Sequence, residues 1–345
     1  MKQIGIIANP ASGRDIRRLV AHGTVIDNIE KVNIVTRVIL GAIAAGVDRI
    51  HIMPDTFGLG EEALRRARRT EKADSYVDII PMTIEGGQND STEAARYMED
   101  QGVGAIVTLG GDGTNRAVSK GTLDVPLLPL STGTNNVFPC FLEGTVAGIL
   151  ATVVAGYELD ESAVERRQRM DIYRDGELVD HALIDVVVTR SLYVGSRAVW
   201  DMSDVSQVFL TQAQPTDIGF SALGGFAAPL CAEDVGGLYL KIGPGGTILA
   251  PIAPGLVSHV PVSQILDIPP EESFPIDTYP CVVALDGERE VTYTWRQRGE
   301  VELNLKGPLV INREAAMNDA IDRGLFVFDK EKIEWQQRFY CRSWD

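Results

Sequence analysis

The chain has 345 residues, 45% of them hydrophobic, and a formal net charge of −16 at pH 7. This length is sufficient for two domains, and the apolar fraction excludes a globally disordered chain. The acidic balance argues against a nucleic-acid or anionic-membrane partner, because both need clustered Lys and Arg. It remains compatible with a nucleotide ligand, which backbone amides and Mg²⁺ can hold.

Strands and helices alternate from the start of the chain to about residue 157. Apolar runs predict strands at 3–8, 49–53, 77–82, 105–109 and 125–130. Helical periodicity and capping signals predict helices at about 29–43, 61–70, 90–100, 115–120 and 145–155. Asp90, with Glu93 three residues later, is expected to cap the third of these helices. This alternation predicts a parallel, Rossmann-like α/β sheet covered on both faces.

Period-two runs separated by Gly and Pro turns dominate from about residue 161. Strands are expected at 170–174 and 178–190, joined at Asp175-Gly176, and again at 238–242, 247–252, 281–285 and 301–305. An amphipathic helix is expected at about 203–212, and another at 313–323. We therefore predict an α/β nucleotide-binding domain at 1–157 and an antiparallel β-sandwich acceptor domain at 158–310. A tail at 311–345 is predicted to pack on the first domain, with 325–328 returning to it.

The stretch Gly110-Gly111-Asp112-Gly113-Thr114 follows a predicted buried strand and precedes a predicted helix. Its glycines would let the backbone approach a phosphate, whose oxygens the N–H groups of the turn would face. Asp112 offers a carboxylate that can hold a hydroxyl, take its proton or reach a metal. Alone, such a turn is a weak signal, because it also fits a tight strand-to-helix turn in which Asp112 simply caps the helix.

Two further loops of small polar residues follow the predicted strands at 3–8 and 125–130. Because ligands of open α/β sheets bind at the carboxyl ends of the strands, these loops favour a phosphate site. The predicted phosphate-binding residues are Asn9, Ser12, Gly13, Gly110, Gly111, Gly113, Thr114, Thr132, Gly133, Thr134, Asn135 and Asn136.

These motifs resemble the superfamily that unites NAD kinases with diacylglycerol and sphingosine kinases, and within it the ATP-NAD kinase-like proteins that include acetoin catabolism protein X. Residues 110–114 match its G-G-D-G-T signature, and residues 9–13 and 129–136 look like the N-P-x-S-G and P-x-G-T-G-N loops of the lipid-kinase branch. Segments 218–225 and 251–258 are similar to NAD-kinase segments, and Asp286-Gly287-Glu288 matches the D-G-E turn of both branches.

The resemblance implies an ATP- and Mg²⁺-dependent kinase in which Asp112 orients or deprotonates the acceptor hydroxyl. It implies that Asp185, Ser221 and Asp286 line the acceptor side, although Asp185 and Asp286 equally fit strand-edge or turn carboxylates. Ile184, Gly255 and Val260 stand where NAD kinases carry Asn, His and Arg, so the acceptor signature is degraded.

The expected function is therefore an NAD kinase-like phosphotransferase that makes NADP from NAD. A kinase of another small hydroxyl compound or a lipid, and a catalytically inactive nucleotide-binding regulator, remain alternatives. The donor is open between ATP and polyphosphate, the metal ligands are not assigned, and the resemblance makes a homo-oligomer plausible.

The expected compartment is the cytoplasm. Four scattered cysteines without a C-x-x-C pair favour ordinary thiols in a reducing compartment over a zinc site or disulfides: Cys140, Cys231, Cys281 and Cys341. The chain enters a predicted strand almost at once, so no signal peptide is expected. The longest apolar helix candidate has about half the residues that a membrane span needs, so no membrane partner is expected either.

Overall fold

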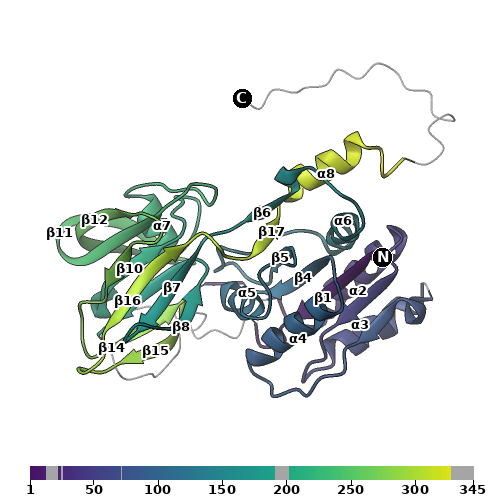
Figure 1. The fold of residues 1–345 in the computed structure, drawn as a ribbon, viewed down its shortest axis with the longest axis horizontal. Coiled ribbons are helices and arrows are strands. Elements are labelled where there is room, and N and C mark those ends of the chain that lie inside the picture. Colours follow the sequence, from purple (N-terminus) through teal and green to yellow (C-terminus); the bar gives the residue numbers. More distant parts are fainter. Residues whose placement is uncertain (13–21, 25, 71, 191–201, 328–345) are drawn as a thin grey trace.

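The structure is a computed structural model, which describes residues 1–12, 22–24, 26–70, 72–190 and 202–327. The chain forms two sheet-based domains that lie side by side, and its last described helix lies on the first of them (Figure 1). Across this described part, no helix is both long and apolar enough to cross a membrane.

A seven-stranded sheet organises the first domain, in the order β3-β2-β1-β4-β5-β17-β6. Its first five strands in the chain are parallel, as predicted: β1 (Gln3–Ala8), β2 (Arg49–Ile52), β3 (Val77–Ile79), β4 (Ala105–Gly110) and β5 (Leu127–Ser131). Two later strands complete it: β17 (Leu309–Ile311) pairs parallel with β5, and β6 (Val164–Arg166) pairs antiparallel with β17 at the edge. The sheet thus includes two strands from the range that the sequence assigned to the second domain.

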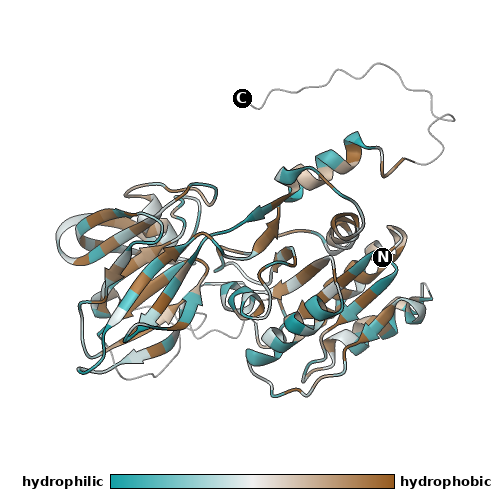
Figure 2. Cartoon of the chain, viewed as in Figure 1, coloured by the Kyte–Doolittle hydropathy of each residue, from teal (hydrophilic) through white to brown (hydrophobic). Residues whose placement is uncertain are grey.

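Helices cover both faces of this sheet because alternate apolar residues of its strands point to opposite sides. Ile4 and Ile6 of β1 face one core, whereas Ile7 faces the other. The first core includes residues of α2 (Asn28–Ala44), α3 (Leu59–Ala67) and α6 (Gly144–Gly156), and the second includes residues of α4 (Asn89–Asp100) and α5 (Asp112–Ser119). Figure 2 shows the hydrophobic strands behind the largely hydrophilic outer surface of α4.

Two antiparallel sheets form the second domain, which confirms the predicted β-rich architecture. The six-stranded sheet has the order β12 (Leu256–Ile268), β11 (Gly237–Ala253), β10 (Val205–Leu210), β9 (Asp185–Thr189), β14 (Cys281–Leu285) and β15 (Glu288–Tyr293). The four-stranded sheet has the order β13 (Ser273–Pro275), β16 (Gly299–Asn304), β7 (Arg169–Arg174) and β8 (Glu177–Ala182). Apolar residues of both sheets share one core, and α7 (Phe220–Gly225) packs on the outer face of the larger sheet.

The helix predicted at about 203–212 is wrong. A short 3-10 turn, η3 (Met202–Asp204), leads into β10, which is central in its sheet and has every residue buried. A strand that is buried on both faces has no alternating pattern, so its apolar spacing can be mistaken for that of a helix.

The strand predicted at 178–190 is in fact two strands. β8 ends at Ala182 in the smaller sheet, and β9 begins at Asp185 in the larger one. The chain therefore changes sheets at Leu183 and Ile184. The strands predicted at 238–242 and 247–252 are, conversely, parts of the single long strand β11.

Asp90 does not cap α4, contrary to the prediction. Gln88 occupies the N-cap position, and the Asp90 carboxylate accepts hydrogen bonds from the N–H groups of Glu85 and Gly86 at 2.9 and 2.8 Å. The carboxylate thus closes the turn before the helix, a local alternative open to short acidic side chains.

The last described helix, α8 (Arg313–Asp322), contacts α6 and the 3-10 turn η2 (Glu161–Ala163), while another such turn, η1 (Ala73–Ser75), follows α3. Residues 325–327 form no strand, and Phe328, the end of the expected returning segment, lies outside the described residues.

Candidate active site

Asp112 is the first residue of α5 and lies at the carboxyl end of β4. Its carboxylate accepts hydrogen bonds from the N–H of Val137, at 3.0 and 3.2 Å to its two oxygens, and from the N–H of Phe138 at 2.8 Å. The positive end of the helix dipole stabilises a negative charge at this position. The carboxylate is thus held in one orientation between the start of α5 and the segment that follows β5.

The loops after β1, β4 and β5 meet at one edge of the sheet, as the sequence predicts for parallel strands. The Asn9 side-chain amide donates to Thr114 Oγ1 at 2.9 Å, and the hydroxyls of Ser12 and Thr132 are 3.1 Å apart. Side chains that are more than 100 residues apart in the chain are therefore in direct contact. Gly13, which was predicted to belong to this group, lies outside the described residues.

Packing requires glycine at two positions of the turn, Gly110 and Gly111. A Cβ atom at Gly110 would lie 2.4 Å from Thr114 Cβ, and one at Gly111 would lie 2.6 Å from Asn136 Oδ1. Both distances are too short for non-bonded atoms. At Gly113 the nearest atom to an added Cβ would be Glu288 Oε1 at 3.4 Å, so this glycine faces the second domain.

Lys31 of α2 stabilises the loop after β1, a role that the sequence did not indicate. Its side chain is 1% exposed, and its ammonium group donates to the carbonyl oxygens of Asn9 at 3.0 Å, Pro10 at 3.3 Å and Ser12 at 2.7 Å. Three carbonyl contacts from one cation fix the shape of the loop. A lysine next to the apolar face of this amphipathic helix was the available signal.

The loop after β5 is held by its own side chains and by residues before α2. The side-chain amide of Asn136 donates to Ser131 Oγ at 2.8 Å, and the N–H of Thr24 donates to Thr134 Oγ1 at 3.0 Å. The nearby N–H of His22 donates to the carbonyl of Pro254 in the turn between β11 and β12. The segment at 22–24 thus connects this loop to the second domain.

Asp286, predicted to contact the acceptor, is fully buried and faces backbone. Its carboxylate accepts hydrogen bonds from the N–H groups of Leu183, Ile184 and Asp185 at 2.8 to 3.3 Å, where the chain changes sheets. Burial raises the pKa of Asp286, and the same N–H groups and the nearby Arg116 counteract this effect. This geometry favours a structural role for Asp286 over direct contact with an acceptor.

The other two predicted acceptor residues are also buried. Asp185 accepts a hydrogen bond from the N–H of Gly287 at 3.3 Å, and Ser221 Oγ lies 2.5 Å from Asp217 Oδ2 and 3.2 Å from the carbonyl of Gln212. Neither of them lines the small pocket at the domain boundary, which is lined by Phe138, Arg167, Gln168, Leu183, Thr211, Gln212 and Ala232. Ser221 is therefore connected to the pocket by its hydrogen bond to the carbonyl of Gln212, which is a lining residue.

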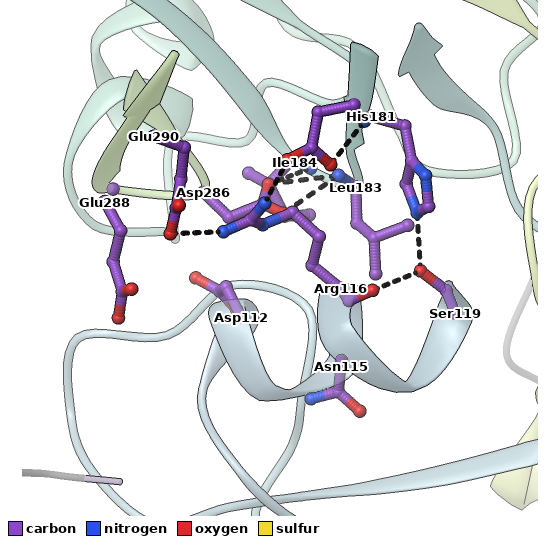
Figure 3. A network of polar contacts seen from close by, with 12 residues as sticks. Asp112, Asn115, Arg116, Ser119, His181, Leu183, Ile184, Asp286, Glu288 and Glu290 are labelled. Atoms are coloured by element: carbon purple, nitrogen blue, oxygen red, sulfur yellow. Dashed lines mark hydrogen bonds and ion pairs between the residues drawn. The ribbon is translucent and has the colours of Figure 1, made fainter. Parts of the chain in front are cut away.

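Arg116 joins the Asp112 helix to the second domain (Figure 3). Its side chain is fully buried, with Nη1 3.2 Å from Asp180, Nη2 3.0 Å from Glu290 and Nε 3.6 Å from Asp286. Burial opposes its charge, but the surrounding carboxylates outweigh this effect and raise the pKa of Arg116 above its ordinary value. The sequence did not single out Arg116, because its partners lie 64 to 174 residues away.

A second polar contact crosses the domain boundary beside the glycine turn. The Gln88 side-chain amide donates to Glu288 Oε2 at 2.7 Å, next to Gly113. Glu288 belongs to the D-G-E turn but was not among the predicted site residues. The D-G-E motif was the sequence signal that could have identified Glu288 as a site residue.

Among the residues that the structure describes, no group of three or more His, Cys, Asp or Glu side chains could hold a metal ion. This does not conflict with Mg²⁺, which nucleotide-dependent enzymes bind largely through substrate phosphates with one or two carboxylates. Asp112 precedes Gly113 in the chain, and Glu288 Oε1 would lie 3.4 Å from a Cβ atom at Gly113. Among the described residues, these two carboxylates have the chemistry that such an ion requires.

Comparisons with known proteins divide the chain in the same place as its sheets. Residues 4–157 match the family model of the ATP-NAD kinase N-terminal domain, and residues 168–306 match that of the acetoin catabolism protein X C-terminal domain. Acetoin catabolism protein X of Cupriavidus necator is 37% identical over 302 residues, which cover 84% of each chain. Yeast NADH kinase in complex with NADH superposes with a TM-score of 0.56 and 15% identity, covering 95% of this chain and 89% of that one. These findings confirm the resemblance that the motifs indicated, and the last of them concerns the fold alone.

Proposed function

The chain belongs to the acetoin catabolism protein X family, with an ATP-NAD kinase-like first half, and we propose that it is a phosphotransferase that moves the γ-phosphoryl group of ATP to a hydroxyl. The observation that carries the proposal is the meeting of the loops after β1, β4 and β5 around Asp112, at the boundary with the second domain. A phosphoryl-transfer site asks for this kind of positioning and charge placement, and for little covalent chemistry.

In the proposed reaction, the acceptor hydroxyl oxygen forms a bond to the γ-phosphorus of ATP. The bond from that phosphorus to the β,γ-bridging oxygen breaks, ADP leaves, and the hydroxyl proton passes to Asp112. The N–H groups of Gly110, Gly111 and Gly113 and the hydroxyls of Thr114 and Thr134 contact the phosphates. Mg²⁺, when bound, neutralises phosphate charge. The N–H groups of Val137 and Phe138 keep the Asp112 carboxylate in a fixed orientation.

NAD is the first candidate acceptor, because the first domain matches the ATP-NAD kinase model. The assay is the formation of NADP from ATP, Mg²⁺ and NAD, detected with an NADP-specific dehydrogenase. Replacement of ATP by polyphosphate in the same assay identifies the donor.

A small hydroxyl compound is the second candidate, favoured by two observations on the acceptor side. A Cβ atom at Gly255 would lie 2.9 Å from His22 Cδ2, so a larger residue there, such as the His of NAD kinases, would displace this contact. Ile184 is buried and its N–H is bound to Asp286, where NAD kinases carry an Asn that helps to hold the dinucleotide. The name of the Cupriavidus necator relative suggests acetoin as the first small compound to test.

An inactive regulator is the remaining alternative. It predicts that calorimetry detects binding of ATP or NAD while no acceptor is phosphorylated. Turnover that depends on Asp112, with any acceptor, excludes it.

A further inference from the structure

The guanidinium group of Arg116 contacts two separate parts of the second domain. Asp180 comes from β8. Asp286 and Glu290 come from the β14–β15 hairpin and lie beside Arg116 in Figure 3. The ammonium group of Lys120, the C-cap residue of α5, adds a second contact to Asp180 at 2.7 Å. One helix of the first domain is therefore fixed to both second-domain sheets through charged groups.

Asp286 links Arg116 to the acceptor side of the second domain. Its carboxylate binds the N–H groups of residues 183–185, where β8 of the smaller sheet gives way to β9 of the larger one. Leu183 lines the pocket at the domain boundary, and Asp185 begins β9. A shift of Arg116 relative to Asp286 would therefore move one wall of the pocket.

A lining residue from the first domain depends on the same helix. Asp112 lies four residues before Arg116, and its carboxylate binds the N–H of Phe138, which lines the same pocket as Leu183. Helix α5 thus holds Phe138 through Asp112 and Leu183 through Arg116 and Asp286. The same helix therefore positions a pocket residue from each domain.

We propose that Arg116 is a positioning residue that holds the second domain, and with it the acceptor, at a fixed place relative to Asp112. The catalytic part of this inference rests on the proposed kinase function. An arginine suits the role better than a lysine, because its planar fork can engage several carboxylates at once whereas a lysine ammonium is a single point of charge. In Arg116→Gln the carboxylates would remain without their shared cation.

The test measures both the arrangement of the two domains and the kinetics of the reaction. Wild type, Arg116→Gln and Arg116→Lys are compared by small-angle X-ray scattering of the full chain. The control is Arg96→Gln, which removes an exposed arginine of the neighbouring helix α4 that pairs with Glu93. We expect a larger radius of gyration for Arg116→Gln, a smaller increase for Arg116→Lys and no change for Arg96→Gln.

The kinetic readout is kcat and KM for the acceptor and for ATP, measured with whichever of NAD and acetoin the wild type phosphorylates. Because a misplacement of about 1 Å costs about 10²-fold, we expect kcat/KM for the acceptor to fall by that order in Arg116→Gln. KM for ATP should stay unchanged, since the phosphate loops belong to the first domain. Arg116→Lys should recover part of the loss.

A folded Arg116→Gln with the wild-type radius of gyration would overturn the proposal, as would an equal loss of ATP and acceptor binding. If Arg116→Gln fails to fold, Glu290→Gln takes its place, because this partner is 24% exposed and its loss leaves two carboxylates on Arg116. Glu290→Gln should increase the radius of gyration and lower kcat/KM for the acceptor, each by less than is expected of Arg116→Gln. If the wild type phosphorylates neither acceptor, the kinase proposal fails separately, and the scattering comparison alone decides the role of Arg116.

Discussion

The Oδ1 atom of Asp112 accepts a hydrogen bond of 2.8 Å from the N–H of Phe138, which ties the first turn of α5 to the segment after β5. The same carboxylate is the proposed proton acceptor. These two roles make different demands on the side chain, because the structural one needs only an oxygen acceptor whereas the catalytic one needs a base.

Asp112→Asn separates the two roles. The amide keeps one oxygen for the N–H of Phe138, so the fold should persist, but it cannot take a proton from the acceptor. We expect kcat to fall by about 10²–10⁴-fold, the usual contribution of a general base. Initial rates and a thermal unfolding curve measure both effects. A fully active variant would refute the assignment of Asp112.

Gly110→Ala should disrupt the contact between the first and second loops. Its Cβ would lie 2.4 Å from Thr114 Cβ, so Thr114 would have to move away from Asn9. We expect weaker ATP binding by calorimetry. Gly87→Ala is the matched control, because an added Cβ there meets no atom within 4 Å. Equal ATP affinity of the two variants would contradict the packing account.

Lys31→Met should loosen the loop after β1 while it keeps the length of the buried side chain. Loss of the ammonium group removes the donor to the carbonyls of Asn9, Pro10 and Ser12. Since an unsatisfied buried polar group costs about 1–3 kcal/mol, we expect a loss of stability of that order in urea unfolding. The exposed Lys306→Met should leave stability unchanged, and equal effects of both substitutions would argue against this role.

Because His181 is buried in its neutral form, the free energy of unfolding should decrease as the pH falls. Burial, with a smaller contribution from Arg169, lowers the pKa of His181 from 6.5 to about 3, and its Nε2 lies 2.7 Å from Ser119 Oγ. Below pH 6.5 the unfolded chain binds a proton at this histidine that the folded chain does not bind until about pH 3. Stability is therefore lost as the pH falls through this range, by up to about 1.4 kcal/mol per pH unit.

The comparison of wild type with His181→Gln isolates this effect. Glutamine can keep the contact with Ser119 but does not titrate. Urea unfolding at pH 7 and pH 5 should show a stability difference between the two proteins that shifts in favour of His181→Gln at the lower pH. The same difference at both pH values would contradict the buried neutral histidine.

Much of the first domain could be predicted from the sequence, because its signals are local. The apolar runs at 3–8 and 105–109 correspond to β1 and β4 within one residue. The loops that follow them carry small polar residues, and parallel strands bring such loops to one edge whatever their distance in the chain. Asn9 and Thr114 could therefore be assigned to one site from pattern alone.

The errors arise where distant groups decide the local structure. The break between β8 and β9 depends on the Asp286 carboxylate, which lies about 100 residues away and binds N–H groups that would otherwise continue a strand. The buried β10 has no alternation to distinguish it from a helix. Arg116 is a single charge in a short helix, and its importance comes from partners in another domain.

The most direct test of the phosphotransferase proposal is transfer of the labelled γ-phosphoryl group of ATP, followed by separation of the products. Wild type and Asp112→Asn are incubated with labelled ATP, Mg²⁺ and either NAD or acetoin. We predict that the wild type gives a labelled product with at least one acceptor, and that Asp112→Asn forms it about 10²–10⁴-fold more slowly. A protein that binds ATP but labels neither acceptor, or an Asp112→Asn variant that labels as fast as the wild type, would contradict the proposed function.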